Sequence, residues 1–280
     1  MQAPLGKFLP SLHGCLMENL DDQGAHDDAP PATPAATVVV FRRDADGGPA
    51  QLLMVERSGS MAFAGGATVF PGGKVDPADY DLANTIEDGR EHDDLAGRIA
   101  AIRETLEETG LVIGVTGKVD AASAAEARKL LLETARLADV LASFEWRLDL
   151  DALVPFARWL PRHRNMRVFD TRFYLADLGT GMVEVVVDAT ENRHLFWASA
   201  AEALRLADDG SIKIIFPTRR NLERLAQFDD FSSARAHALA TPIVTVTPRI
   251  ESRDGQQWLA IPSDAGYPID GEALVSAARA

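Results

Sequence analysis

The chain has 280 residues, and its 46% apolar and 25% charged residues are typical of a globular protein. The net charge of −14 argues against nucleic acid as the main partner, because binding a phosphate backbone requires clustered positive charge. No apolar run approaches the roughly 18 residues of a membrane-spanning helix, and the single cysteine, Cys15, excludes an intramolecular disulfide and favours a reducing, cytoplasmic compartment.

Residues 1–36 have the composition of a disordered tail. Aspartates lead into a proline-rich linker, no secretory signal is visible, and Met17 is an alternative start. At roughly 100–200 residues per domain, we predict one domain over residues 37–280. Within it we expect an insertion at about 80–92, a helical segment at about 121–142 and a C-terminal extension at about 217–280.

The domain is predicted to begin with a β-hairpin. Apolar and β-branched residues fill 37–41 and 51–55, and the segment between them is rich in the Asp, Gly and Pro residues of a turn. A third strand is expected at 67–70, ended by a loop that contains Gly72 and Gly73. The polar stretch from Tyr80 to His92 is expected to be a loop.

A helix is predicted from Asp93 to the residue before Gly110, because an N-cap residue and a C-terminal stop enclose one apolar stripe. After it we expect one helical segment over 121–142, strands at 167–176 and 182–187, helices at 199–207 and 217–226, and one or two strands within 241–260. Since helices and strands are mixed throughout, the fold class is α+β or mixed α/β.

Three glutamates lie on the predicted helix, opposite its apolar stripe. Glu104, Glu107 and Glu108 fall within roughly 100° of each other around the helix axis. Like charges four residues apart destabilise a helix slightly, and a bound cation would reverse that effect. Carboxylate oxygens suit Mg²⁺ or Mn²⁺ rather than zinc. A plain solvated acidic face is the alternative, but the glycine-rich loop before the helix favours a phosphate and metal site.

The segment Arg103-Glu104-Thr105-Leu106-Glu107-Glu108-Thr109-Gly110-Leu111 resembles the second half of the Nudix hydrolase motif, in which a glycine, five residues, a glutamate and seven residues precede R-E-U-x-E-E-x-G-U. Gly73 matches the glycine. Asp79 stands where the motif has glutamate, and 23 residues instead of seven separate it from Arg103. The resemblance implies an α/β/α sandwich with a mixed β-sheet between helices.

An insertion of this kind also resembles one Nudix subgroup, the relatives of the mammalian peroxisomal coenzyme A diphosphatase. The resemblance extends over roughly residues 38–262. The further matching segments include Arg57-Ser58, Gly66-Ala67, Trp159-Leu160, Phe169-Asp170-Thr171, Trp197 and Arg219-Arg220-Asn221-Leu222. This resemblance implies hydrolysis of coenzyme A or acyl-coenzyme A to 4′-phosphopantetheine, or its acyl form, and adenosine 3′,5′-bisphosphate.

The family resemblance also implies roles for particular residues. A divalent metal, Mg²⁺ or Mn²⁺, would be held by Glu104, Glu107, Glu108 and the carbonyl of Gly72. Glu104 or Glu191 would be the general base, and one sequence does not choose between them. Arg103 would orient a carboxylate or pair with Asp79. Substrate contacts are expected from Gly73, Arg57, Arg164 and Arg167, although neutralisation of acidic neighbours is the favoured reading of the basic cluster between Arg158 and Arg172.

Two other functions stay open at this point. One is a diphosphatase for ADP-ribose or NADH, and the other is a Nudix-fold sensor that binds a nucleotide without cleaving it. All three glutamates of the motif are present and no basic DNA-binding module is visible, which favours an enzyme. The expected partner is a small nucleotide, and a homodimer is left open.

Overall fold

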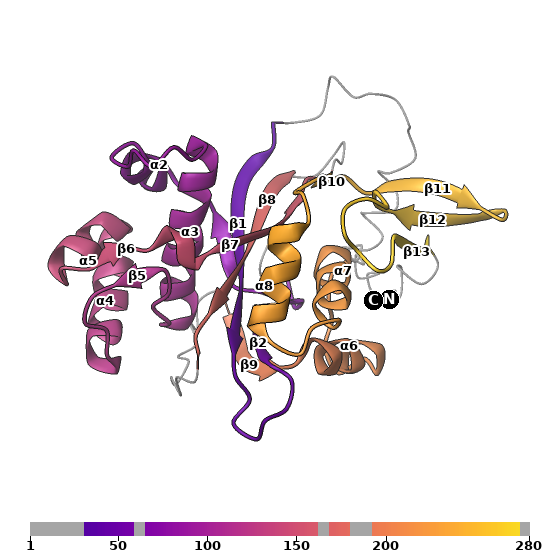
Figure 1. Ribbon diagram of the computed structural model, residues 1–280, viewed down its shortest axis with the longest axis horizontal. Helices are drawn as coiled ribbons and strands as arrows, with labels where there is room; N and C mark the ends of the chain where they lie inside the picture. The colour runs from indigo at the N-terminus through magenta and orange to yellow at the C-terminus, as the bar shows by residue number, and fades with distance from the viewer. Residues whose placement is uncertain (1–30, 59–64, 162–167, 180–191, 275–280) are drawn as a thin grey trace, which may run out of the picture.

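The computed structural model describes residues 31–58, 65–161, 168–179 and 192–274 (Figure 1). The strands are β1 Thr33–Arg42, β2 Gln51–Arg57, β3 Thr68–Val69, β4 Gly72–Lys74, β5 Val115–Thr116, β6 Arg147–Leu148, β7 Val154–Trp159, β8 Phe169–Asp177, β9 Asn192–Ala198, β10 Thr245–Val246, β11 Arg249–Arg253, β12 Gln256–Ala260 and β13 Gly271–Ala273. The helices are α2 Pro77–Ala83, α3 His92–Thr109, α4 Ala121–Thr134, α5 Leu137–Ser143, α6 Ala200–Asp208, α7 Phe216–Leu225 and α8 Phe231–Ala240, with a 3-10 turn at Leu150–Ala152.

An 8-stranded mixed sheet forms the centre of the domain, in the order β10-β7-β8-β1-β2-β3, with β4 paired to β1 and β9 paired to β2. β1 runs parallel to β8 from Thr33↔Phe169 to Phe41↔Asp177, whereas β2 and β4 run antiparallel to β1. The β1–β2 hairpin and the strand at 67–70 predicted from the sequence are confirmed.

Side chains of β1 enter two separate cores. Val38 and Val40 pack with α3 on one face of the sheet, and Val39 and Phe41 pack with α7 and α8 on the other. A strand buried on both faces has a continuous apolar sequence, as β1 has. Helices α2 to α5 lie on one side of the sheet and α6 to α8 on the other (Figure 1). The predicted α/β/α sandwich is therefore confirmed.

Gly72 and Gly73 lie in a short strand, so the prediction that they form a loop is wrong. β4 pairs with the first half of β1 at Ala35–Thr37, and β2 joins β1 only at Phe41 and Arg42. A Cβ on Gly72 would overlap the carbonyl of Ala36. Because glycine has no Cβ, β4 can approach the sheet at this point, and it carries both glycines under α3.

The boundary of the tail at residue 36 is also wrong. β1 begins at Thr33, whose amide donates to the carbonyl of Val168 over 2.8 Å. Pro34 accepts from the amide of Val75 over 3.0 Å, and Ala35 and Ala36 are buried. Tertiary pairing therefore recruits residues whose proline-rich composition indicates a linker. Residues 1–30 lie outside the described part of the chain.

Two truncations test where the folded domain begins. Deletion of residues 1–36 removes the first four residues of β1 with their ladder hydrogen bonds, each contributing about 0.5–1.5 kcal/mol. We expect the melting temperature to fall by about 5–10 °C in a thermal unfolding experiment. Deletion of residues 1–31 is the control and should leave it unchanged. Equal melting temperatures for the two truncations would contradict the assignment of Thr33–Ala36 to the sheet.

The insertion is helical at both ends rather than a loop throughout. α2 spans Pro77–Ala83, and α3 already begins at His92. Asp76 and Asp79 form a capping box at the start of α2, in which the Asp76 amide donates to the Asp79 carboxylate over 2.9 Å, and a proline occupies the first turn. These are ordinary helix-start signals, so the overall polarity of the segment was the misleading feature.

The helical segment at 121–142 is divided in two. α4 ends at Thr134 because Ala135 adopts a left-handed conformation with φ 54°, and α5 begins at Leu137. The change of direction lets Leu131 of α4 and Leu137 of α5 enter the same core. A single straight helix would carry the second of these side chains away from it.

The C-terminal half agrees with most of the predicted elements. The predicted strand at 167–176 and helices at 199–207 and 217–226 correspond to β8, α6 and α7, whereas the strand predicted at 182–187 lies outside the described residues. α8 is additional, and β11, β12 and β13 form a separate three-stranded sheet. None of the helices in the described part of the chain is long and apolar enough to span a membrane.

Candidate active site

Helix α3 carries the three predicted metal-binding glutamates. Its predicted apolar stripe, Leu95, Ile99, Ile102 and Leu106, is buried, which confirms the orientation of the helix. The glutamate side chains are less exposed than those of a fully solvated helix face would be. The side chains of Glu104 and Glu107 are 14% and 35% exposed, and Glu108 is buried at 6%. Strand β4 packs against α3, and its Gly72 and Gly73 contact Glu108 and Glu104.

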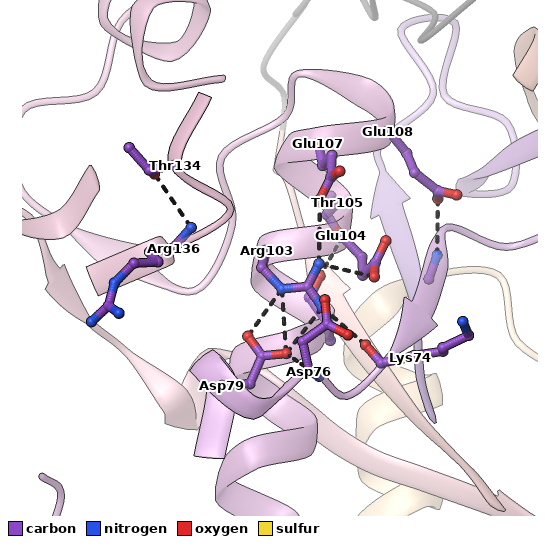
Figure 2. A network of polar contacts seen from close by, with 12 residues as sticks. Lys74, Asp76, Asp79, Arg103, Glu104, Thr105, Glu107, Glu108, Thr134 and Arg136 are labelled. Atoms are coloured by element: carbon purple, nitrogen blue, oxygen red, sulfur yellow. Dashed lines mark hydrogen bonds and ion pairs between the residues drawn. The ribbon is translucent and has the colours of Figure 1, made fainter. Parts of the chain in front are cut away.

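Arg103 lies at the centre of a polar network beside these glutamates (Figure 2). Its Nε and Nη2 donate to the carboxylate of Asp79 over 3.0 and 2.9 Å. Its Nη1 donates to Glu104 over 3.0 Å and to Glu107 over 3.3 Å, and its Nη2 also donates to the carbonyl of Lys74 over 2.9 Å. Arg103 thus contacts both Asp79 and the carboxylates of α3, the two kinds of contact expected for it, and its role in positioning metal ligands stays a prediction.

Asp79 and Arg103 meet in space although 23 residues separate them in the chain. The inserted residues leave through α2 and return through α3, and these two helices pack against each other. Both side chains are almost fully buried. Burial by itself lowers the pKa of Arg103, but the hydrogen bonds that Arg103 donates to Asp79 and the charge of Glu104 raise that pKa above its ordinary value. The contact between Asp79 and Arg103 therefore forms despite the inserted residues between them.

Glu104 packs directly against Gly73. A Cβ built on Gly73 would overlap the carboxylate of Glu104, so any larger residue here would displace that carboxylate. Burial raises the pKa of Glu104 to about 8, with Arg103 lowering it and the charges of Glu108 and Glu107 raising it further. Added positive charge beside Glu104 would therefore favour its carboxylate form.

Glu108 binds the backbone of β4. The amide of Gly72 donates to Oε2 of Glu108 over 3.0 Å. The structure therefore brings Gly72 to the acidic face, as expected, although the contact that it shows is through the amide and not through the carbonyl that the sequence analysis favours as a metal ligand.

The glutamate side chains do not converge on one point as they stand. Among the described residues, no three His, Cys, Asp or Glu side chains are grouped closely enough to hold a metal ion. Glu104 and Glu107 turn to Arg103, and Glu108 turns to Gly72. The donor set itself fits a hard divalent cation, because it offers carboxylate oxygens and lacks sulfur or imidazole. Burial raises the pKa of Glu104 most, and such a cation would relieve the repulsion from Glu108 and Glu107 that raises it further.

The contact between Gly73 and Glu104 gives a direct test of the site. Gly73→Ala should push the Glu104 carboxylate aside and lower kcat/KM by about 10²-fold, since small misplacements of a functional group have effects of that size. Gly48→Ala is the control, because its Cβ would displace the carboxylate of Asp44 in an exposed turn. The same loss in both variants, or none in Gly73→Ala, would contradict the placement of Glu104 in the site.

The residues predicted to bind substrate are only partly described. Arg57 is the last residue of β2 and is half-buried. Arg164, Arg167 and Glu191 lie outside the described residues, so their roles stay predictions. Two other members of the basic cluster pair with acids: Arg158 donates to both oxygens of Asp170 over 2.8 and 2.6 Å, and Arg172 donates to Glu91 over 3.4 Å. For these two, the expected neutralisation of acidic neighbours is confirmed.

Two further residues, Asp76 and Arg128, contact Arg103 or the backbone of α3 beside the glutamates, and the sequence did not predict either contact. Asp76 caps α2 and lies 3.6 Å from Arg103, and its Asp-Pro dipeptide is a local signal that could have revealed it. Arg128 of α4 donates from Nε to the carbonyl of Glu107 over 2.9 Å and from Nη2 to the carbonyl of Glu108 over 3.3 Å. No local sequence pattern predicts these contacts of Arg128.

Comparison with known proteins agrees with this geometry. The family described as NUDIX domain matches residues 32–210. The acyl-coenzyme A diphosphatase NUDT19 of Gallus gallus is 27% identical over 280 residues, which cover 79% of this chain and 73% of that protein. Among solved structures, a NUDIX hydrolase from Alicyclobacillus acidocaldarius is similar with a TM-score of 0.63 and 26% identity, covering 74% of this chain and 96% of the other. The matched residues include β4 and all of α3.

Proposed function

Because the chain belongs to the Nudix hydrolase family, which acts on phosphoanhydride bonds, we propose that it is a metal-dependent diphosphatase of coenzyme A or acyl-coenzyme A. Water would attack one phosphorus of the diphosphate. The products would be 4′-phosphopantetheine, or its acyl form, and adenosine 3′,5′-bisphosphate. The observation that carries the proposal is the acidic face of α3, in which Glu104 packs on Gly73 and Glu108 binds Gly72.

Glu104, Glu107 and Glu108 are the residues that we expect to hold Mg²⁺ or Mn²⁺. When bound, such an ion neutralises the diphosphate and activates the attacking water. Arg103 donates to the carboxylates of both Glu104 and Glu107 and so holds these two groups close to each other. Asp79 in turn fixes the guanidinium of Arg103 through two of its nitrogens. The chain's own part is thus to orient the oxygen donors before substrate arrives.

The general base stays a choice between Glu104 and Glu191. Burial raises the pKa of Glu104 to about 8, and added positive charge beside it would favour the carboxylate form that a general base requires. Glu191 lies outside the described residues. A pH profile of kcat/KM for Glu104→Gln and Glu191→Gln would separate the two, since loss of the base removes the acidic limb of the profile.

Coenzyme A as the substrate is supported by the name of the avian relative and tested by a substrate panel. Coenzyme A carries a 3′-phosphate, and charge-assisted hydrogen bonds to arginine contribute about 1.5–3 kcal/mol each. If Arg164 or Arg167 binds this group, coenzyme A should exceed dephospho-coenzyme A by roughly ten- to a hundredfold in kcat/KM. Arg164→Ala or Arg167→Ala should remove most of that ratio while sparing dephospho-coenzyme A.

The panel also decides between the proposed substrate and its alternatives. Products are identified by mass spectrometry with coenzyme A, acetyl-coenzyme A, ADP-ribose and NADH, each with Mg²⁺ or Mn²⁺. Faster cleavage of ADP-ribose or NADH would contradict the coenzyme A assignment and leave the general diphosphatase activity. Binding of a nucleotide without release of any product would indicate a sensor instead of an enzyme.

A further inference from the structure

The last turn of α3 carries negative side chains at the C-terminal end of the helix, where negative charge is unfavourable. Glu107 and Glu108 are close to its C-terminus, and the turn contains no basic residue. The C-terminus of a helix already carries partial negative charge from unpaired carbonyls, so acidic side chains are unfavourable there. A turn that must present two glutamates to a metal therefore needs positive charge and hydrogen-bond donors from elsewhere in the fold.

Arg128 of α4 supplies both. Its Nε and Nη2 donate to the carbonyls of Glu107 and Glu108 over 2.9 and 3.3 Å, and its side chain packs over Gly110, where an added Cβ would lie 3.7 Å from its Cδ. The carbonyl of Leu106 accepts from the amide of Gly110 over 2.9 Å. Each of the carbonyls from Leu106 to Glu108 is therefore bound.

Helix α4 holds Arg128 at a fixed position. Its N-terminus has a reciprocal cap, in which the amide of Ser123 donates to Asp120 over 2.8 Å and the amide of Asp120 donates to the hydroxyl of Ser123 over 2.9 Å. Ala127 and Leu131, on either side of Arg128 in the sequence, are buried in the core that also contains α3. A guanidinium carried by a capped and packed helix positions a neighbour more accurately than one carried by a loop.

We propose that Arg128 is a positioning residue for the metal-binding glutamates. It holds the backbone of the turn that carries Glu107 and Glu108, and it supplies the cation that α3 lacks in that turn. The inference rests on the proposed function, since it assumes that these glutamates bind a divalent metal. It predicts that the affinity for the metal depends on a residue that acts through backbone carbonyls, on a helix outside the motif.

The experiment measures Mn²⁺ binding to the full chain by electron paramagnetic resonance of free Mn²⁺, in the absence of substrate and well below the melting temperature of each variant. Arg128→Met keeps the length of the side chain but removes its charge and donors. We expect the Kd for Mn²⁺ to rise about 10- to 100-fold, as for other residues that orient metal ligands. Arg128→Lys keeps the charge without the two-pronged donor pattern, and its Kd should be intermediate.

Arg136→Met is the matched control. Arg136 lies at the start of α5, its side chain is 53% exposed and it pairs with Asp139 at 3.7 Å, so its loss should leave the Kd within about twofold. Hydrogen exchange of the Gly110 amide should also accelerate in Arg128→Met and not in Arg136→Met, because the freed turn opens more often.

An unchanged Kd for Mn²⁺ in folded Arg128→Met would overturn the inference. If Arg128→Met does not fold, an unchanged Kd for Mn²⁺ in Arg128→Lys would overturn it instead. A purely structural role would lower the melting temperature without changing the Kd. Failure of the proposed function has a different signature, because then the unsubstituted chain would not bind Mn²⁺, or Glu107→Gln would leave its Kd unchanged.

Discussion

Glu107→Gln and Glu108→Gln are expected to lower kcat by about 10²–10⁴-fold with Mg²⁺, because loss of one charged ligand removes several kcal/mol of transition-state stabilisation. Glutamine keeps the shape of the side chain. In Glu108→Gln it also keeps an oxygen that can accept from the amide of Gly72. Melting temperatures should therefore stay close to that of the unsubstituted chain, and the loss should appear in steady-state kinetics.

Glu133→Gln on α4 is the control for these variants. Its side chain is 62% exposed and pairs only weakly with Lys129 at 4.0 Å, so neither activity nor stability should change. Full Mg²⁺-dependent activity in both Glu107→Gln and Glu108→Gln would show that the acidic face of α3 is not the metal site.

Arg103→Met is expected to have the largest effect on stability. Its guanidinium is buried and contacts Asp79, Glu104 and Glu107. Removal of one member of a buried ion pair leaves the other charge unpaired and costs about 3–5 kcal/mol in the free energy of unfolding. In a chain of this size we expect the melting temperature to fall by roughly 6–20 °C in differential scanning calorimetry. Activity should fall as well, because Glu104 and Glu107 lose the donor that orients them.

Arg205→Met provides the comparison. Arg205 also contacts two carboxylates, those of Glu202 and Asp209, at 2.8 and 2.9 Å, but its side chain is 59% exposed. Exposed pairs contribute about 0–1 kcal/mol, so its melting temperature should change little. Asp79→Asn combined with Arg103→Met completes a double-mutant cycle. Strictly additive losses would show that the contact between Asp79 and Arg103 does not couple the two helices.

Local sequence was sufficient for several features of the site. The apolar stripe from Leu95 to Leu106 determines which side of α3 is buried, so it also determines that Glu104, Glu107 and Glu108 share another side. Gly110 in the left-handed conformation ends the helix as its position predicts. The apolar and β-branched runs of β1 and β2 likewise predict their strands. These features follow from residues within a few turns of one another.

Strand edges were less predictable because neighbouring strands decide them, and the start of α2 was missed although its capping signals are local. Thr33–Ala36 look like linker residues, yet pairing with β4 and β8 makes them part of β1. The polar composition of 80–92 indicated a loop, whereas α2 and α3 take both of its ends. Gly72 and Gly73 were expected in a loop and form a strand, since only the folded sheet offers them an edge to join.

Residue types alone indicate the chemistry expected of the site: an acidic helix, two glycines before it and an arginine beside its first glutamate. The arrangement of these groups depends on tertiary packing. That packing brings Asp79 to Arg103 across 23 residues, presses Glu104 against Gly73 and places Arg128 on the carbonyls of Glu107 and Glu108. The reason is that side-chain type and helical period are local properties, whereas a contact between distant residues depends on how the elements that carry them pack.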